Sequence, residues 1–334
     1  MGSDEHSMQD DSNLPQGSAA ENGMDIARLE ALASQLPEWG MRDVVVVRHG
    51  QLVWEWHAAG DDRLAAIYSC TKSILSALVG IAIGQGILAG PEQPAAELLP
   101  ELAEAADERK RAITIGHLLT MTSGLEWPDF DKPYRRMKAS ADWVRYVAET
   151  PLAHAPGQVF AYNSGGSHLL SAILTRATGE SALAFARKHI LDKLGVRDVR
   201  WNDHGGINEG GTGIHMSSRD LAKFGLLYLQ GGRWGGEQLV PEWWVRASLS
   251  PKHKGLMNYE PPIYGQYGYH WWISERSANR WADCPFAFGY GGQCLFIVPP
   301  ADLVVVVRKR PAGRNQAILS HRVLFDGIAE AVLS

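Results

Sequence analysis

Apolar and polar residues follow two periodicities along this chain, which predict strands toward both ends and helices between them. Runs of β-branched and aromatic residues bounded by turn residues are typical of strands, whereas apolar residues three and four positions apart are typical of helices. The predicted strands cover 44–47, 52–56, 267–273, 294–298 and 303–307, and the predicted helices cover 25–36, 69–82, 113–121, 141–149, 166–177, 182–191 and 315–333.

Strands at both chain ends with helices between them predict a single sheet that is assembled from the two ends. The expected fold class is α/β (α+β), with an antiparallel sheet flanked by helices and an inserted, mostly helical domain. Residues 24–90 and 214–334 are assigned to the sheet domain, and residues 91–213 to the helical domain. Residues 1–23 are acidic and polar, and we expect them to form a flexible tail.

The helix that begins at Ser69 is apolar on all sides, which predicts that it is buried in the middle of the fold. Ser69 and Lys72 are three residues apart, so they lie on one helix face with Cβ atoms about 5–6 Å apart. The helix N-terminus supplies free N–H groups and partial positive charge, and burial would lower the pKa of the lysine. This is a site where a serine alkoxide could form, although Ser69 could also act only as a helix cap.

Two further segments carry candidate chemistry. A turn over 156–166 presents Tyr162 just before a helix, and a glycine-rich turn over 288–293 precedes an apolar strand. A buried tyrosine is more often part of a core, Asn163 and Ser164 could cap the helix that follows, and the glycines could form a plain turn or bulge. These alternatives stay open at the level of single motifs.

Composition excludes several other classes of protein. The formal net charge of −5 and pI near 6.2 argue against a nucleic-acid partner. The three cysteines have no C-x-x-C spacing, and no H-E-x-x-H, Walker or G-x-G-x-x-G motif occurs, so no metal or cofactor is implied.

The longest apolar run, 74–83, is too short for a membrane span. A cytoplasmic location is the default, although an exported form with its signal removed would leave no trace.

Taken together, these segments resemble the serine hydrolases of the β-lactamase and penicillin-binding fold, in particular the class C β-lactamase-like branch with its family VIII esterases and 6-aminohexanoate dimer hydrolases. The similarity spans roughly 40–310 and includes the segments 117–125 and 216–225. The resemblance implies that Ser69 is the nucleophile, Lys72 its neighbouring base and Tyr162 the proton relay to the leaving group. It also implies an oxyanion hole formed by the backbone N–H groups of Ser69 and Gln293. Whether Lys72 or Tyr162 takes the serine proton stays open.

Two departures from that family pattern bear on the substrate. Where β-lactamases carry Lys-Thr-Gly, this chain reads Tyr290-Gly291-Gly292, and where they carry Tyr-x-Asn, it reads Tyr162-Asn163-Ser164. The first change removes a cation and a hydroxyl, and the second replaces an amide by a hydroxyl or leaves the amide to Asn163. Both changes favour a neutral ester or a linear amide as the small-molecule substrate. The expected substrate-binding residues are Asn163, Ser164, Gly291 and Gly292, with Trp127, Tyr134, His215 and Tyr290 in the cleft.

Two alternatives remain beside this prediction. One is β-lactamase or D-alanyl peptidase activity, and the other is a catalytically inactive module of the same fold that serves in binding or assembly. The oligomeric state is not predicted by the sequence.

Overall fold

The computed structural model describes residues 14–129, 131–256, 264–274, 281, 283–311 and 314–333. Its described strands form one eight-stranded antiparallel sheet in the order β10-β11-β12-β13-β14-β15-β1-β2, together with three small sheets. The strands of the large sheet are β1 (Met41–Arg48), β2 (Gln51–His57), β10 (His253–Lys254), β11 (Gln266–Tyr267), β12 (Trp272–Ile273), β13 (Pro285–Gly289), β14 (Gln293–Val298) and β15 (Leu303–Lys309). The sheet therefore joins both ends of the chain, and the expected fold class is confirmed.

The centre of the sheet is buried on both faces, which explains its uninterrupted apolar runs. Val44 and Val46 of β1 enter one core cluster, while Val45 and Val47 enter the other. Successive side chains of a strand point to opposite faces, so a run of four valines supplies both cores at once.

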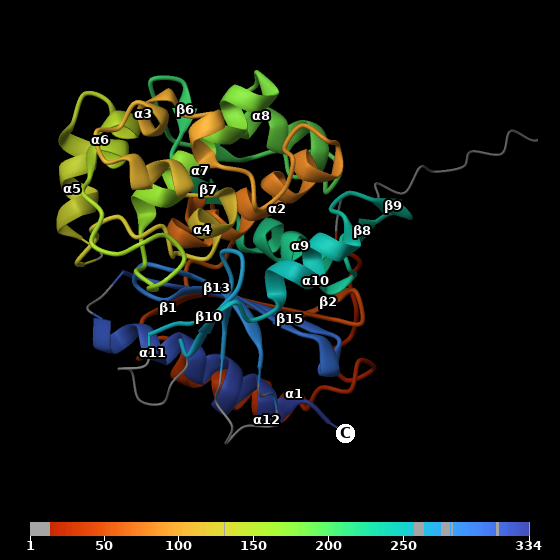
Figure 1. Ribbon diagram of the computed structural model, residues 1–334. Coiled ribbons are helices and arrows are strands. Elements are labelled where there is room, and N and C mark those ends of the chain that lie inside the picture. Colours follow the sequence, from red (N-terminus) through yellow and green to blue (C-terminus); the bar gives the residue numbers. More distant parts are fainter. Residues whose placement is uncertain are drawn as a thin grey trace, which may run out of the picture.

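Helices cover both faces of the sheet (Figure 1). The helices α1 (Ile26–Gln35), α11 (Arg314–Arg322) and α12 (Ala329–Ala331) lie on one face. The helix α9 (Ser218–Leu229) packs on β1, β14 and β15 from the other face, with α10 (Glu242–Leu249) beyond it.

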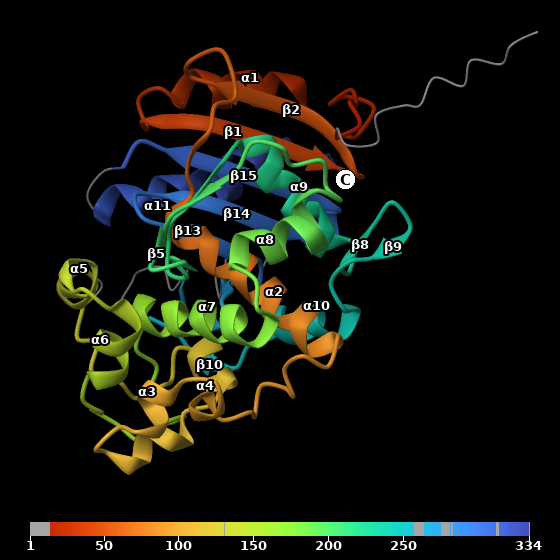
Figure 2. The same ribbon diagram turned by 90° about the horizontal axis from the view of Figure 1, so that it is seen from above.

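The helical layer is made of segments between β2 and α9. It contains α2 (Thr71–Gly84), α3 (Pro100–Ala103), α4 (Ile115–Leu119), α5 (Lys132–Ala139), α6 (Trp143–Glu149), α7 (Ser164–Thr178) and α8 (Ala182–Ala186). Figure 2 shows the strands in order from β2 to β13, with α2 and α7 next in line after β13. The contact between α2 and β13 sets the boundary between the two parts of the fold.

The helix α2 is buried along almost its whole length, as its sequence predicts. Close packing on every side requires small residues at some positions. A Cβ atom at Gly80 would overlap the indole of Trp244 on α10, so this glycine lets the two helices approach. The backbone of α2 is thereby fixed between α10 and α7, which also contacts it.

Two expectations about local structure are wrong. The segment 267–273 is not one strand, because β11 and β12 form a hairpin whose turn places His270 at a positive φ of 61°. The flexible tail was expected to reach residue 23, yet Gly17 N–H donates to Leu52 O and Leu14 is buried, so this segment packs along β2. Residues 1–13 lie outside the described part of the chain.

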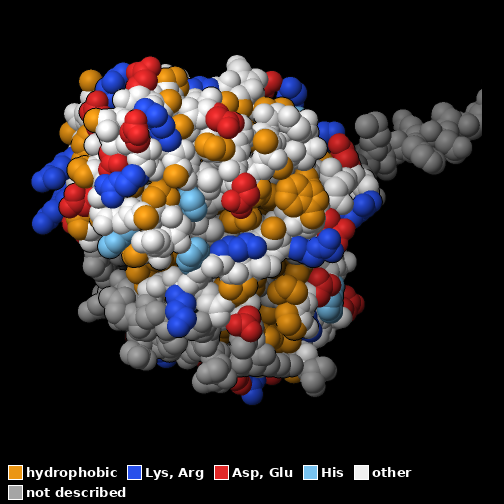
Figure 3. All heavy atoms as spheres, in the orientation of Figure 1, with side chains coloured by type: hydrophobic (Ala, Val, Ile, Leu, Met, Phe, Trp, Pro, Cys, Tyr) orange, Lys and Arg blue, Asp and Glu red, His pale blue; other side chains and the backbone are white. Residues whose placement is uncertain are grey.

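On the face of the molecule drawn in Figure 3, Lys and Arg side chains are interspersed with Asp and Glu. None of the helices in the described part of the chain has the length and apolar character that a membrane span requires.

Candidate active site

Ser69 lies in a short 3-10 turn, Tyr68–Cys70, that leads directly into α2. Tyr68 has a positive φ of 48°, an uncommon conformation for a bulky residue, so the chain bends sharply just before the serine. The first residue of α2, Thr71, accepts a hydrogen bond from Ile214 N–H at 3.2 Å, which ties the turn to the strand β7 (Ile214–Met216). Ser69 is thus held at the N-terminus of a buried helix.

The side chain of Lys72 is buried and directed back toward Ser69. Its Nζ lies 3.0 Å from Ser69 Oγ, 3.0 Å from Ser164 Oγ on α7 and 2.6 Å from the carbonyl oxygen of Gly211. The same nitrogen lies 4.8 Å from the centre of the Tyr162 ring. All three hydrogen-bonding partners are uncharged groups, so the amine is well solvated by the protein without an ion pair.

Burial shifts the pKa values of both titratable groups beside Ser69. Desolvation lowers the pKa of Lys72 to about 7, while the negative charge of Glu209 opposes that shift. Desolvation raises the pKa of Tyr162, and a hydrogen bond with Ser69 works in the opposite direction. Near neutral pH, Lys72 can therefore exist as a free amine while Tyr162 keeps its proton.

Tyr162 belongs to an aromatic wall. Its ring stacks on Trp272 of β12 with centroids 5.3 Å apart and an angle of 23° between planes, and it meets Tyr267 edge-on at 6.2 Å. These contacts fix the ring, so the phenol group is held beside Ser69.

A cavity of about 740 Å³ opens in front of Ser69, between the sheet and the helical layer. One part of its lining is aromatic and another is polar or charged. The lining residues are Ala66, Tyr68, Ser69, Asp131, Tyr134, Lys138, Tyr162, Ser164, Asn202, Glu209, Thr212, Gly213, His215, Leu256, Tyr264, Trp272, Phe288, Tyr290 and Gly291. The structure thus brings together Ser69, Lys72, Tyr162 and Ser164, and it places Tyr134, His215, Tyr290 and Gly291 on the cavity wall.

Three residues expected at the cleft lie elsewhere. Trp127 is 5% exposed and packs in the core against Gly165, where a Cβ atom would meet its indole at 2.7 Å. Asn163 caps α7, because its Oδ1 accepts the N–H of Gly166 at 2.9 Å. Gly292, in the turn between β13 and β14, is not among the residues that line the cavity.

The predicted second oxyanion donor is the backbone N–H of Gln293, which lies on β14 opposite Gly289. The side chain of Gln293 binds the carbonyl oxygens of Tyr290 and Lys309, and these bonds do not involve its backbone N–H. The residue that approaches the serine is Gly289 at the end of β13, where a Cβ atom would lie 3.2 Å from Ser69 N. The N–H group of Tyr290, the next residue, is therefore the better candidate to act with that of Ser69.

Sequence reasoning missed the loop 209–213, which supplies Glu209, Gly211 and Thr212 to the site. Its sequence, Glu-Gly-Gly-Thr-Gly, was the available signal, because clustered glycines permit close backbone approach. A Cβ atom at Gly211 would meet Ser164 at 2.8 Å, so this loop packs directly on α7.

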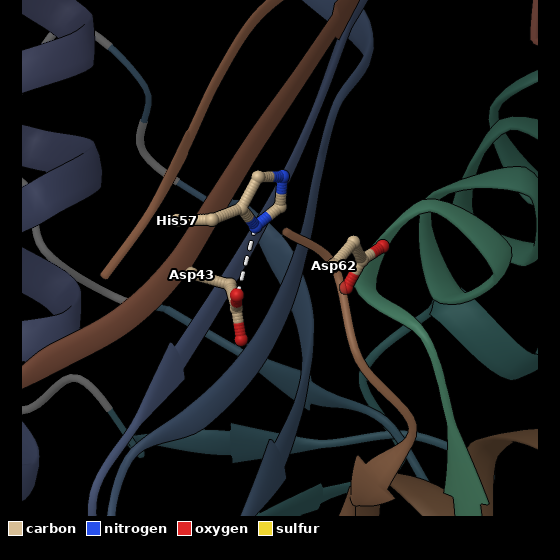
Figure 4. A group of neighbouring side chains, drawn as sticks. All are labelled: Asp43, His57 and Asp62. Carbon is tan, nitrogen blue, oxygen red and sulfur yellow. Dashed lines mark hydrogen bonds and ion pairs between the residues drawn. The ribbon is translucent and has the colours of Figure 1, made fainter. Parts of the chain in front are cut away.

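A second polar cluster lies outside the cavity (Figure 4). The ligand atoms of Asp43, His57 and Asp62 lie within 4.8 Å of one another, and His57 Nδ1 is 2.8 Å from Asp43 Oδ1. The guanidinium of Arg308 already supplies a cation there, with Nη2 2.7 Å from Asp43 and 2.8 Å from Asp62. The group therefore fits an ion-pair network better than a metal site.

This network anchors the segment that leads to Ser69. Asp62 accepts hydrogen bonds from the N–H groups of Ser218 and Arg219 at the start of α9. Arg308 donates to the carbonyl oxygen of Met216 on β7 at 2.9 Å and to that of Arg63 at 2.8 Å. The short strands beside the turn that carries Ser69 are thus attached to β15.

Comparisons with known proteins place this architecture in a family. The sequence model described as "Beta-lactamase" matches residues 29–316, which is most of the chain. The chain therefore belongs to the beta-lactamase family, a family of hydrolases in which its curated relatives carry several different activities in their names.

Two of those relatives are a 6-aminohexanoate-dimer hydrolase and an esterase. The first, from Paenarthrobacter ureafaciens, is 27% identical over 311 residues, 84% of this chain and 77% of the relative. The second, esterase EstB from Burkholderia gladioli, is 31% identical over 179 residues, 46% of this chain and 45% of the relative.

Solved structures agree on the fold. A putative 6-aminohexanoate-dimer hydrolase from Bacillus anthracis superposes with a TM-score of 0.75 at 20% identity, covering 93% of this chain and 86% of that one. A penicillin-binding protein homologue from Caulobacter crescentus gives 0.72 at 17% identity, covering 91% and 96%. At these identities the likeness concerns the fold alone.

Proposed function

We propose that this protein is a serine hydrolase that cleaves a neutral ester or a linear amide through an acyl-enzyme on Ser69. The observation that carries the proposal is the 3.0 Å contact between Ser69 Oγ and the buried amine of Lys72, at the wall of a cavity large enough for a small substrate. A serine hydroxyl is a weak nucleophile unless an unprotonated base lies beside it.

Acylation begins with transfer of the Ser69 proton to Lys72. The pKa of Lys72, about 7, suits a general base, whereas the raised pKa of Tyr162 suits a general acid. The serine oxygen then attacks the substrate carbonyl carbon, and the carbonyl oxygen takes up the electron pair. The N–H groups of Ser69 and Tyr290 would stabilise that oxyanion, and loss of one such donor typically costs about 10²–10³ in turnover.

Collapse of the tetrahedral intermediate breaks the ester or amide bond. The departing alcohol or amine takes a proton from Tyr162, which regains one from the Lys72 ammonium, whose Nζ lies 4.8 Å from the centre of the Tyr162 ring. Water next attacks the acyl carbon and gives its proton to the same pair. The Ser69 oxygen leaves as a hydroxyl, and the acid product is released.

The cavity wall favours a substrate without an anionic group near the reacting carbonyl. On the side of β13, the lining residues are Phe288, Tyr290 and Gly291, none of which carries a charge. The cation of the Lys-Thr-Gly motif has no counterpart there among the described residues. A neutral ester or a linear amide fits this apolar wall, in line with the names of the two curated relatives.

A labelling and turnover experiment tests the proposal. A fluorophosphonate probe should label the wild-type protein and leave the Ser69→Ala variant unlabelled. Rates with p-nitrophenyl butyrate, 6-aminohexanoate dimer, nitrocefin and a D-alanyl dipeptide then define the substrate class. Fastest turnover of nitrocefin or the dipeptide would contradict the neutral-substrate assignment. If the probe does not label the protein and none of the substrates is hydrolysed, the inactive binding module is favoured.

A further inference from the structure

Glu209 is a buried carboxylate beside the reacting groups. It follows β6 (Ile207–Asn208), and only 1% of the residue is exposed. Its Oε1 accepts a hydrogen bond from Thr212 Oγ1 at 2.8 Å, and its Oε2 lies 2.9 Å from Lys138 Nζ. Burying a carboxylate is unfavourable, so its retention here calls for a physical reason.

The backbone of the same loop contacts Lys72. Glu209 N–H donates to Asn202 O at 2.8 Å, and the indole of Trp201 donates to Glu209 O at 3.0 Å. Two residues later, Gly211 O lies 2.6 Å from Lys72 Nζ. Contacts that hold Glu209 in place therefore also hold the Gly211 carbonyl group that accepts a hydrogen bond from Lys72 Nζ.

The other titratable groups that face Lys72 are neutral near pH 7. In the turn before α2, burial raises the pKa of the Cys70 thiol, and just before α7 burial raises the pKa of the Tyr162 phenol. His270 packs beneath, with Nδ1 3.1 Å from Lys72 O, and burial lowers the pKa of its ring to about 3. Burial raises the pKa of Glu209 itself, while the hydrogen bond from Thr212 and the charge of Lys72 oppose that shift. Among the described residues around Lys72, Glu209 is therefore the remaining acidic group.

We propose that Glu209 is a positioning residue that stabilises the ammonium formed when Lys72 accepts the proton of Ser69, and that it also holds the loop 209–213 on that amine. This role rests on the proposed function. The inference goes beyond that function, because it assigns the counter-charge of Lys72 to Glu209, a residue that makes no direct contact with Ser69. A carboxylate attracts a nearby ammonium more strongly inside a protein than in water, since the surroundings screen less.

Lys138 on α5 balances this charge from the opposite side. Its Nζ lies 4.3 Å from the centre of the Trp143 ring, and 37% of its side chain is exposed toward the cavity. Tyr134 completes this group, because its hydroxyl lies 2.9 Å from Thr212 Oγ1. The charge that Glu209 presents to Lys72 is thus partly compensated by Lys138.

The test compares the pH dependence of wild type and Glu209→Gln, which keeps the size and hydrogen-bonding capacity of the side chain. The acidic limb of kcat/KM reports the free base, so removal of the charge should move that limb to lower pH by about half a pH unit or more. Asp131→Asn is the matched control. It removes an equal charge from the same cavity wall, but 65% of the Asp131 side chain is exposed, so the limb should not move.

A second readout does not depend on turnover. The Nζ titration of Lys72, followed by NMR with labelled lysine and assigned with Lys72→Met, should shift in Glu209→Gln in the same direction as the kinetic limb. If the wild type turns over and neither readout shifts, the role of Glu209 is wrong. If no substrate is hydrolysed but the titration shifts, the proposed function fails and the charge coupling stands. If Glu209→Gln does not fold, Lys138→Met gives the reciprocal test: the titration should move to higher pH, and an unchanged or lower value overturns the inference.

Discussion

Two buried cations in this molecule have opposite kinds of partner. Arg308 lies between the carboxylates of Asp43 and Asp62, at 2.7 and 2.8 Å. Lys72 is buried to the same extent, yet its three hydrogen-bonding partners are two hydroxyls and a carbonyl. An arginine does not lose its proton in proteins, whereas a buried lysine without an ion-paired neighbour readily does.

The difference in partners means that Arg308 carries a permanent charge, whereas Lys72 can gain and lose a proton. At Arg308 two carboxylates lie against a guanidinium that keeps its proton, and the result is a joint between β15 and the segment that leads to Ser69. At Lys72 the neutral partners hold the amine in place in either protonation state. A direct carboxylate contact would raise the pKa of Lys72, and Glu209 is proposed to act on the amine without such a contact.

The largest expected effect comes from removing the amine. Lys72→Met should lower kcat by about 10²–10⁴-fold, the range of a general acid–base group, when hydrolysis of p-nitrophenyl butyrate is measured. Because a buried amine is replaced by an apolar chain of similar length, the free energy of unfolding should stay the same or rise. Activity near that of wild type would contradict the role of Lys72 as a base, and a large loss of stability in urea would contradict the expected stability alone.

The matched substitution at Arg308 should lower stability and leave the reactivity of Ser69 in place. Arg308→Met leaves two buried carboxylates without a cation, which typically costs about 3–5 kcal/mol. Equilibrium urea denaturation measures this loss. Residual folded protein should still react with the fluorophosphonate probe at Ser69. Unchanged stability would mean that the network is not a structural joint.

The smallest expected effect concerns His57. A hydrogen bond to Asp43 raises the pKa of His57, against the opposing effect of burial. A raised folded-state pKa stabilises the fold below the unfolded pKa, about 6.5, and that contribution is lost as the pH rises through the folded value. The stability difference between wild type and His57→Gln should therefore be larger at pH 6 than at pH 9. The same difference at both pH values would exclude a charged imidazole in this network.

The parts of the site that the sequence predicts are those set by local geometry. Ser69 and Lys72 lie three residues apart at the start of one helix, so helix geometry alone places them together. The two faces of β1 follow in the same way from its run of valines. In both cases the relevant neighbours are a few residues away along the chain.

The parts that the sequence misses depend on register between distant segments. Gln293 and Tyr290 differ by three positions, and the choice between their N–H groups depends on how β13 pairs with β14. Trp127 follows a turn that reads as exposed, yet the small surface of Gly165 admits it to the core. Glu209 comes near Lys72 only because its loop folds onto α7, an arrangement that periodicity does not encode.

The pairing of Val46 with Val305 has a consequence for how the protein is made. Bringing such distant residues together is entropically costly, and folds rich in these contacts form slowly. The turn that carries Ser69 is attached to β15 through Arg308, and β15 is synthesised long after that turn. A growing chain would thus contain Ser69 and Lys72 long before the contacts that fix their turn could form. Ser69 would therefore stay unreactive in incomplete polypeptides.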